Sequence, residues 1–197
     1  MSFLVGITGG IGSGKTTVSN IFLHLGYKIY NSDERAKYLM ERDEETVEKI
    51  TDLLGESAYK EGLINKKLIS ESLYNDDNLR EKINAIVHPV TINDFNHWVN
   101  ENPDDILVKE SALIYQTRSY KELDCVICVK ADKDIRIKRI LDRDKFRNEE
   151  DIMQIMRSQI IYNYEGEFKP HYIIENNGKD LLLPKVIRII EEIKSKV

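Results

Sequence analysis

Long apolar runs are missing from this sequence of 197 residues. No stretch approaches the roughly 20 consecutive apolar residues that span a lipid bilayer. The opening residues, MSFLVGITGG, show neither a basic leader nor a small-residue cleavage site, so they do not resemble a secretory signal. We therefore expect no membrane association and a cytoplasmic location.

Cysteine is also scarce, since the chain contains only Cys125 and Cys128. Their C-x-x-C spacing occurs in redox and metal sites. However, the surrounding DCVICV is a short apolar run typical of a buried strand, and residues three apart on a strand point to opposite faces. Two ligands are too few for structural zinc. The favoured hypothesis is two small core residues in a reduced protein.

An excess of positive charge is absent as well. The sequence has 29 basic and 34 acidic side chains and a formal net charge of −5, which gives no electrostatic reason to expect a nucleic-acid or membrane partner. A polyanionic small-molecule substrate would need a locally basic site. Hydrophobic residues make up 41% of the chain, enough for one packed domain, and we expect a monomer or weak homo-oligomer.

Apolar strands alternate with amphipathic helices along the chain. Strands are predicted at residues 3–8, 27–31, 106–110, 125–129 and 171–175. This alternation predicts a parallel sheet of five strands with right-handed crossovers, in an open three-layer α/β fold. Residues 33 to about 98 are strongly helical, with breaks expected near Gly55, Gly62 and His88-Pro89. That stretch is too long for a crossover, so it predicts an inserted helical subdomain.

The segment Gly9-Gly-Ile-Gly-Ser-Gly14-Lys15-Thr16 matches the phosphate-binding pattern G-x-x-x-x-G-K-[ST] in full, between an apolar strand and an amphipathic helix. Its glycines let successive N–H groups turn inward around phosphate oxygens, and the helix N-terminus adds its own N–H groups and dipole. Lys15 supplies a cation for the β- and γ-phosphates, and the Thr16 hydroxyl is a hard ligand suited to Mg²⁺. The residues predicted to bind ATP here are Gly10, Ile11, Gly12, Ser13, Gly14, Lys15, Thr16 and Thr17.

This motif leaves the phosphate acceptor open. A GTPase should carry N-K-x-D after a later strand, but Asn65-Lys-Lys-Leu68 lacks the Asp, and Asp52-Leu-Leu-Gly55 falls inside the helical insertion. Both are interpreted as chance matches. One alternative is another small-metabolite kinase, of the shikimate or nucleotide type, although the former should show Gly-Gly-Gly after its third strand. A nucleotide-dependent switch or binding module is the other, and it predicts ATP binding without transfer to a small alcohol.

Several segments, taken in order, resemble the dephospho-coenzyme A kinases nearly from end to end. They are Val5–Lys15 with its doubled glycine, Asn31-Ser-Asp33 (D-A-D in the family), Ile83-Asn84-Ala-Ile86-Val-His88-Pro89 (L-N-x-I-x-H-P), the lid-like Arg139-x-x-x-Arg143-Asp144 and Arg157-x-Gln159, and Ile174-Glu-Asn176-Asn177-Gly178 (I-x-N-x-G). That family transfers the γ-phosphoryl group of ATP to the ribose 3′-hydroxyl of dephospho-CoA, the last step of coenzyme A synthesis.

The resemblance implies roles for individual residues. Asp33 would orient and deprotonate the acceptor hydroxyl, although from the sequence alone it could equally cap a helix over Glu34 to Met40. Lys15, Arg139 and Arg143 would stabilise the transferred phosphoryl group, the two arginines from a lid. Asn176 and Gly178 would line the adenine pocket. The residues expected to contact the acceptor are Asp33, Lys66, His88, Glu110 and Arg157.

Two of these expectations have simpler readings. From the residues alone, we expect His88 to lie at the end of a helix and to be hydrogen-bonded locally. Arg136 shares a helix face with Arg139 and Arg143, and from the residues alone all three could form a solvated basic surface. This interpretation is preferred for Arg136, whereas the lid resemblance favours phosphate contacts for the other two. By the same resemblance, residues 1–33, 104–138 and 168–197 would form the nucleotide-binding core, 34–103 the acceptor-binding subdomain and 139–167 the lid.

The sequence departs from the family pattern in three places. Asn31 replaces the first Asp of D-A-D, which keeps hydrogen bonding but removes a charge. Glu110-Ser-Ala-Leu-Ile-Tyr-Gln116 stands in place of D-I-P-L-L-F-E; Glu110 can be an oxygen ligand for Mg²⁺ or its waters, whereas Gln116 cannot carry the charge of the closing Glu. Lys66 stands where an Arg is typical and would hold phosphate as a point charge.

Overall fold

The computed structural model describes residues 2–65, 68–69, 76–159 and 169–196. The chain divides into two compact units. One is formed by Met1–Asn31 together with Asn102–Val197, and the other by Ser32–Glu101. The second unit is therefore continuous in sequence and interrupts the first.

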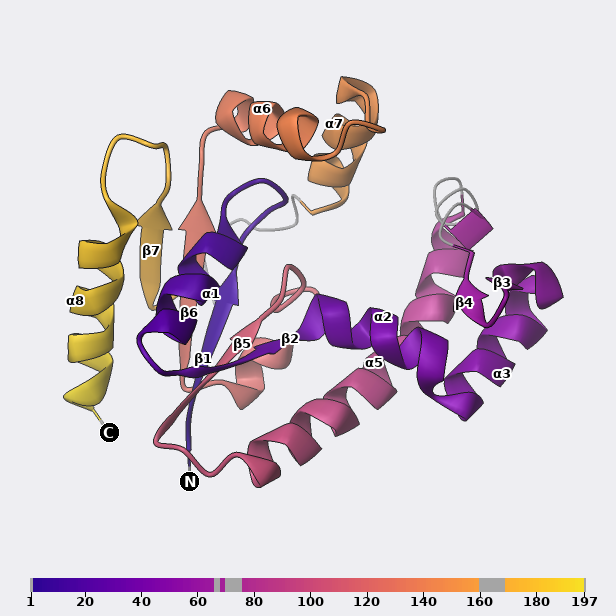
Figure 1. Ribbon diagram of the computed structural model, residues 1–197, viewed down its shortest axis with the longest axis horizontal. Coiled ribbons are helices and arrows are strands. Elements are labelled where there is room, and N and C mark those ends of the chain that lie inside the picture. Colours follow the sequence, from indigo (N-terminus) through magenta and orange to yellow (C-terminus); the bar gives the residue numbers. More distant parts are fainter. Residues whose placement is uncertain (1, 66–67, 70–75, 160–168, 197) are drawn as a thin grey trace. The chain divides into compact units, whose positions relative to one another are not determined.

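The first unit is built around a five-stranded parallel sheet, which confirms the predicted fold class (Figure 1). The strands are β1 (Phe3–Thr8), β2 (Lys28–Asn31), β5 (Ile106–Glu110), β6 (Cys125–Lys130) and β7 (Tyr172–Glu175). Their order is β2-β5-β1-β6-β7, and every neighbouring pair is parallel. β1 lies at the centre of the sheet. Although β2 follows β1 in the sequence, β5 lies between these two strands.

Helices α1 (Lys15–His24) and α8 (Leu182–Lys194) cover one face of this sheet, side by side in Figure 1. Val18, Phe22 and Val186 are fully buried there against strand residues such as Val108. Burying each such side chain contributes about 1.5–3 kcal/mol relative to leaving it exposed. The opposite face is covered by the segment after β5, with Ile114, Leu123 and Val126 in its core. A short 3₁₀ helix, Ser119–Glu122, lies in that segment.

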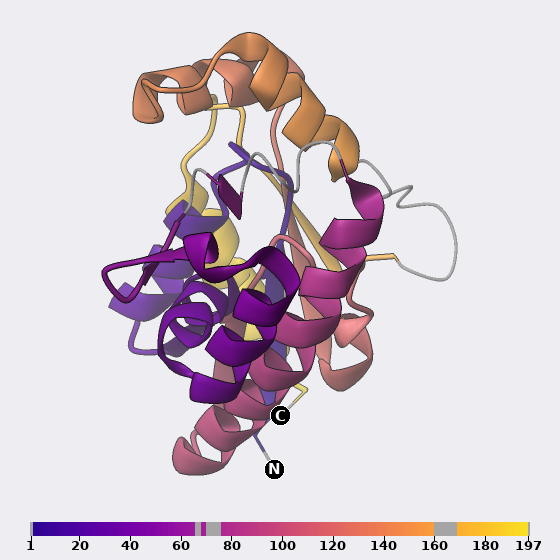
Figure 2. The same ribbon diagram turned by 90° about the vertical axis from the view of Figure 1, so that its right-hand side faces the viewer.

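Strand β6 leads into a pair of packed helices, α6 (Lys133–Arg143) and α7 (Glu149–Ser158), here called the α6–α7 hairpin. Its own small core contains Ile137, Ile140, Ile152 and Met156. α7 starts at a capping box, in which the Asn148 side chain accepts from the Asp151 N–H and Asp151 accepts from the Asn148 N–H. Figures 1 and 2 both place the hairpin over the loop that joins β1 to α1.

The described residues of the second unit include helices α2 (Ser32–Arg42), α3 (Glu44–Leu54) and α5 (Asp77–Glu101). They also include a short antiparallel hairpin of β3 (Tyr59–Lys60) and β4 (Leu63–Ile64). The predicted breaks at Gly55 and Gly62 are confirmed, since α3 ends at Leu54 and Gly62 lies in the hairpin turn; both glycines have positive φ. The hairpin itself was not predicted. Arg35 of α2 donates two hydrogen bonds to the Asp94 carboxylate of α5, which ties these helices together.

The predicted break at His88-Pro89 is wrong, because α5 continues through both residues. Proline removes one helical N–H donor, and in a helix interior it costs about 3 kcal/mol. Apolar packing of this part of α5 offsets this cost. Ile83 and Val87 are buried in one cluster with Ile50, Ala58 and Ile64. Across the described ranges, no helix is both long and apolar enough to cross a bilayer.

Both cysteines are buried in β6 and neither forms a disulfide. Cys125 belongs to the core beneath α1 and α8, whereas Cys128 alternates with it and shares its side of the strand with Val126. Within the described residues, no group of three or more His, Cys, Asp or Glu side chains could hold a metal ion. The prediction of two core cysteines is confirmed.

Candidate active site

The loop from Gly9 to Lys15, here called the phosphate loop, follows the central strand β1 and contains a tight turn. The Ser13 N–H donates to the Gly10 carbonyl at 3.1 Å, which places Ile11 and Gly12 at the centre of the turn. Gly12 has φ +77°, as the third position of a type II turn requires. At Gly14, with φ +96°, a Cβ would lie only 2.1 Å from the Asn176 side-chain nitrogen. Glycine is needed at both positions.

The positive end of α1 is open toward this loop. Gly14 is its N-cap and makes no side-chain capping bond, and the first turn contains no acidic residue. Lys15 Nζ donates to the Gly9 carbonyl at 2.9 Å, which holds the ammonium group at the foot of the loop. Backbone N–H groups, a helix dipole and a lysine thus converge on one place, an arrangement that binds phosphate groups.

Thr16 and Glu110 form a pair of hard oxygen donors beside the loop. The Thr16 hydroxyl donates to a Glu110 carboxylate oxygen at 3.0 Å. Glu110 ends β5, the strand next to β1, and only 5% of it is exposed. Mg²⁺ takes a few protein oxygens of this kind and completes its octahedron with waters and phosphate oxygens. The two side chains therefore fit a Mg²⁺ site.

Asn176 supports the phosphate loop from the end of β7. It is 8% exposed, and its side-chain nitrogen donates to the Ser13 carbonyl at 2.9 Å. Its oxygen accepts a longer bond, 3.3 Å, from Arg139 Nη2. Arg139 also lies 3.4 Å from the Gly12 carbonyl oxygen and 3.5 Å from that of Ser13, distances at which hydrogen bonds are weak. Arg139 is therefore held loosely above the loop.

A hollow of about 310 Å³ lies beside the loop at the carboxyl ends of β6 and β7. Its lining residues are Gly10, Ser13, Val129, Lys130, Ala131, Asp132, Arg136, Glu175 and Asn177. Asn177 faces this hollow, whereas the side chain of Asn176 is turned toward the loop. The Ser13 hydroxyl, also in the lining, has no hydrogen-bond partner among the described atoms.

Two residues that contact the phosphate loop, Arg136 and Gln159, were not among the site residues predicted from the sequence. The interpretation of Arg136 as part of a solvated surface is wrong, because its Nε donates to the Ile11 carbonyl at 2.8 Å. Gln159, just beyond α7, accepts from the Ile11 N–H at 2.7 Å. The contact of Arg136 could have been suspected from the sequence, because its helical spacing places it on the same face as Arg139. Gln159 was part of the lid-like Arg157-x-Gln159 segment, but that resemblance did not indicate its contact with Ile11, 148 positions away.

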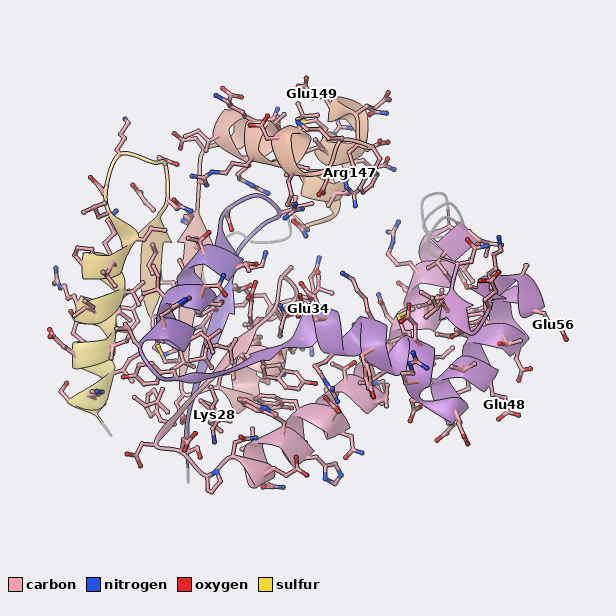
Figure 3. The ribbon with its side chains drawn as sticks, viewed as in Figure 1. Lys28, Glu34, Glu48, Glu56, Arg147 and Glu149 are labelled. Carbon is pink, nitrogen blue, oxygen red and sulfur yellow. The ribbon has the colours of Figure 1, made fainter. Side chains whose placement is uncertain are left out.

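Arg143 is paired within its own chain segment. Its Nε and Nη2 donate to the two carboxylate oxygens of Asp144 at 2.8 and 2.9 Å, and Arg147 donates to the same carboxylate at 3.2 Å. The hydrogen bond from Arg143 holds the pKa of Asp144 below its usual range. Figure 3 shows Arg147 near the connection between α6 and α7. Arg157, on α7, is exposed.

Of the remaining predicted site residues, Asp33, Lys66 and His88 belong to the second unit, whereas Gly178 and Thr17 belong to the first. Asp33 is half-buried in the first turn of α2, which runs from Ser32 to Arg42. His88 is half-buried within α5, and burial lowers its pKa below the ordinary 6.5. Lys66 lies outside the described residues. Gly178 follows β7 with φ +77°, and Thr17 is exposed on α1.

Comparison with known proteins gives the family. The sequence profile of the dephospho-CoA kinase family matches residues 3–181. The chain is 35% identical to a dephospho-CoA kinase of Porphyromonas gingivalis, over 98% of this chain and 95% of that protein. It is 32% identical to one of Fusobacterium nucleatum, over 96% and 98%.

Solved structures share the fold. A Thermus thermophilus protein superposes with a TM-score of 0.82 at 22% identity, covering 100% of this chain and 98% of that one. The dephospho-CoA kinase of Campylobacter jejuni gives a TM-score of 0.68 at 24% identity, covering 100% of both chains. These identities bear on the fold alone, whereas the profile and the sequence relatives span nearly the whole chain. This chain therefore belongs to the dephospho-CoA kinase family.

Proposed function

We propose that this protein transfers the γ-phosphoryl group of ATP to the ribose 3′-hydroxyl of dephospho-CoA, giving coenzyme A and ADP. The observation that carries the proposal is the family match over residues 3–181, which includes the whole phosphate loop. The loop geometry supports the nucleotide half, because turn, helix terminus and Lys15 converge on one anion site. Phosphoryl transfer needs positioning and charge neutralisation more than covalent chemistry, which these groups supply.

On the nucleotide side, Lys15 would leave the Gly9 carbonyl or share its donors with the β- and γ-phosphates, since an ammonium group has three N–H donors. Thr16 and Glu110 would hold Mg²⁺, which neutralises phosphate charge when bound. Arg139 is proposed to contact phosphate as well, because its present bonds of 3.3 to 3.5 Å are weak enough to exchange. Asn176 and Gly178 follow β7 and are proposed to border the adenine.

Arg143 requires a different account. Its bidentate pair with Asp144 occupies the same fork of N–H donors that would bind equatorial phosphoryl oxygens. Because the side chain is 65% exposed, the pair is screened by solvent and contributes at most about 1 kcal/mol. The γ-phosphate of ATP carries about two negative charges at pH 7 and competes readily with such a partner. We therefore assign Arg143 to the transferring phosphoryl group, with residues 139–167 acting as a lid.

On the acceptor side, Asp33 is proposed to orient and deprotonate the 3′-hydroxyl. It lies in the first turn of α2, directly after β2, the strand that ends at Asn31. Lys66, His88 and Arg157 are proposed to bind the acceptor, with 34–103 as the acceptor-binding subdomain. The lowered pKa of His88 keeps its imidazole neutral at pH 7, so it would act by hydrogen bonding and not as a cation.

The test is an ADP-release assay with purified protein, ATP and Mg²⁺, in which dephospho-CoA, adenosine, AMP and shikimate are compared as acceptors. We expect ADP and a product of coenzyme A mass with dephospho-CoA, and background ADP with the other three. Turnover of AMP or shikimate without turnover of dephospho-CoA would overturn the substrate assignment. ATP binding with no transfer to any acceptor would favour a nucleotide-dependent binding module.

A further inference from the structure

The α6–α7 hairpin, taken together with Gln159, the residue that directly follows it, contacts Ile11 of the phosphate loop in three ways. Gln159 accepts a hydrogen bond from the Ile11 N–H at 2.7 Å. Arg136 Nε donates to the Ile11 carbonyl at 2.8 Å. The Ile11 side chain packs against the hairpin core, which includes Ile140 and Ile152. Both backbone polar groups and the side chain of one loop residue are therefore held by the same hairpin.

These contacts fix the orientation of the central peptide of the turn. In type I and type II turns this peptide points in opposite directions, and here it joins Ile11 to Gly12. A trans peptide directs its C=O and N–H to opposite sides. Because Arg136 holds the Ile11 carbonyl, the Gly12 N–H is directed away from Arg136. One of the N–H groups of the phosphate nest is thus aimed by a side chain of α6.

The close approach of α6 to the phosphate loop is a separate observation, and it also indicates that α6 supports the loop. A Cβ at Gly12 would lie 2.7 Å from the backbone oxygen of Arg136, and one at Gly10 would lie 2.3 Å from Arg136 Nη2. Two of the loop glycines therefore leave room for the hairpin. The loop pattern serves contact with α6 in addition to contact with phosphate.

We propose that Gln159 and Arg136 are positioning residues, which hold the phosphate loop in its ATP-binding conformation before the nucleotide arrives. A loop that is already ordered loses less conformational freedom on binding, so binding is tighter. The Ile11 N–H is then a structural donor occupied by Gln159 and not a phosphate ligand. This inference depends on the proposed function only in requiring that the protein binds ATP, and it does not depend on the identity of the acceptor.

The first measurement is ATP affinity by calorimetry in the presence of Mg²⁺, for the full chain and three variants. Gln159→Leu keeps the size of the side chain and removes the acceptor, whereas Gln159→Glu keeps an acceptor oxygen. Gln154→Leu makes the same change elsewhere on α7 and serves as the matched control. We expect Gln159→Leu to weaken ATP binding about fivefold, from the net worth of one hydrogen bond. Gln159→Glu should bind ATP at least twice as tightly as Gln159→Leu does. Gln154→Leu should bind ATP with the affinity of the parent protein.

The second measurement separates positioning from a general loss of structure. Amide exchange of Ile11, followed by NMR without nucleotide, should be slow in the parent and in Gln154→Leu, and about tenfold faster in Gln159→Leu. The KM for the acceptor should stay within a factor of two. Unchanged ATP affinity in Gln159→Leu would overturn the proposal, as would equal weakening of both substrates with a lowered melting temperature. If dephospho-CoA is not turned over, the substrate assignment fails while these ATP measurements still decide the inference.

Discussion

The Thr16 hydroxyl and the Glu110 carboxylate are joined by a 3.0 Å hydrogen bond although 94 positions separate them in the sequence. The contact arises because β1 and β5 are neighbours in the sheet, so that the residues following β1 meet the last residue of β5. Glu110 is almost fully buried. Burial strengthens the attraction between a carboxylate and a cation, because water screens the two charges less.

Glu110→Gln removes this charge while keeping the shape of the side chain. We expect the Mg²⁺ concentration for half-maximal activity to rise about 10–100-fold, the usual effect of losing a group that orients a metal site. A Mg²⁺ titration of the ADP-release rate measures it. Glu191→Gln, an exposed change on α8, is the control and should leave the titration unchanged. An unaltered Mg²⁺ requirement in Glu110→Gln would remove Glu110 from the site.

Asp33→Asn tests the proposed general base. Turnover should fall by about 10²–10⁴, the range for a positioned acid–base group, while the affinity for ATP stays the same. Steady-state kinetics and calorimetry on one preparation give both quantities. Glu48→Gln, an exposed acid on α3 in the same unit, is the control (Figure 3). Near-normal turnover of Asp33→Asn would exclude an essential proton transfer to this residue.

Arg143→Met should lower kcat by about 10², as expected when one charged donor to the transition state is lost. Asp144→Asn acts in the opposite direction, because it releases Arg143 from its bidentate pair. We expect the KM for ATP of Asp144→Asn to fall, by about fivefold at most, since an exposed ion pair contributes no more than about 1 kcal/mol. Steady-state assays at low salt measure both variants. A raised KM in Asp144→Asn would mean that the pair itself positions Arg143.

His88 should titrate below its ordinary pKa of 6.5, because burial disfavours the charged imidazolium. The unfolded chain then takes up a proton at higher pH than the folded chain. Stability should therefore rise with pH through the window just below 6.5 and decrease on acidification, a trend that His88→Gln should reduce. NMR of the imidazole protons gives the midpoint, and urea unfolding at several pH values gives the stability. A midpoint above 6.5 would contradict the burial of this residue.

Neither cysteine should react with Ellman's reagent in the folded protein. Burial raises the pKa of the Cys125 thiol to about 12, so almost no thiolate is present at pH 8. Cys128 is inaccessible in the same strand. Two thiols should appear after unfolding in guanidinium. Rapid labelling of the native protein would contradict the core position of β6.

The sheet and the phosphate loop could be predicted because they depend on local sequence. Continuous apolar runs indicated β1 and β6, and the spacing of Gly9, Gly14 and Lys15 indicated the loop. The contacts of Arg136 and Gln159 could not be predicted, because each joins residues more than 120 positions apart and depends on how the α6–α7 hairpin packs. The break expected at Pro89 failed for a related reason, since tertiary packing outweighed a local preference.

The strand order has a consequence for how the chain folds during synthesis. β1 hydrogen-bonds to β5 and β6, and β2 hydrogen-bonds to β5, so no pair of the parallel sheet can form until residues after Glu101 have left the ribosome. The unit Ser32–Glu101 is continuous and is free to fold in that interval, as units made first usually do. Pairing between segments so distant in sequence is intrinsically slow. The strand that carries the phosphate loop is thus the first part of the sheet to be made, but it has no strand to pair with until about 100 further residues have followed it.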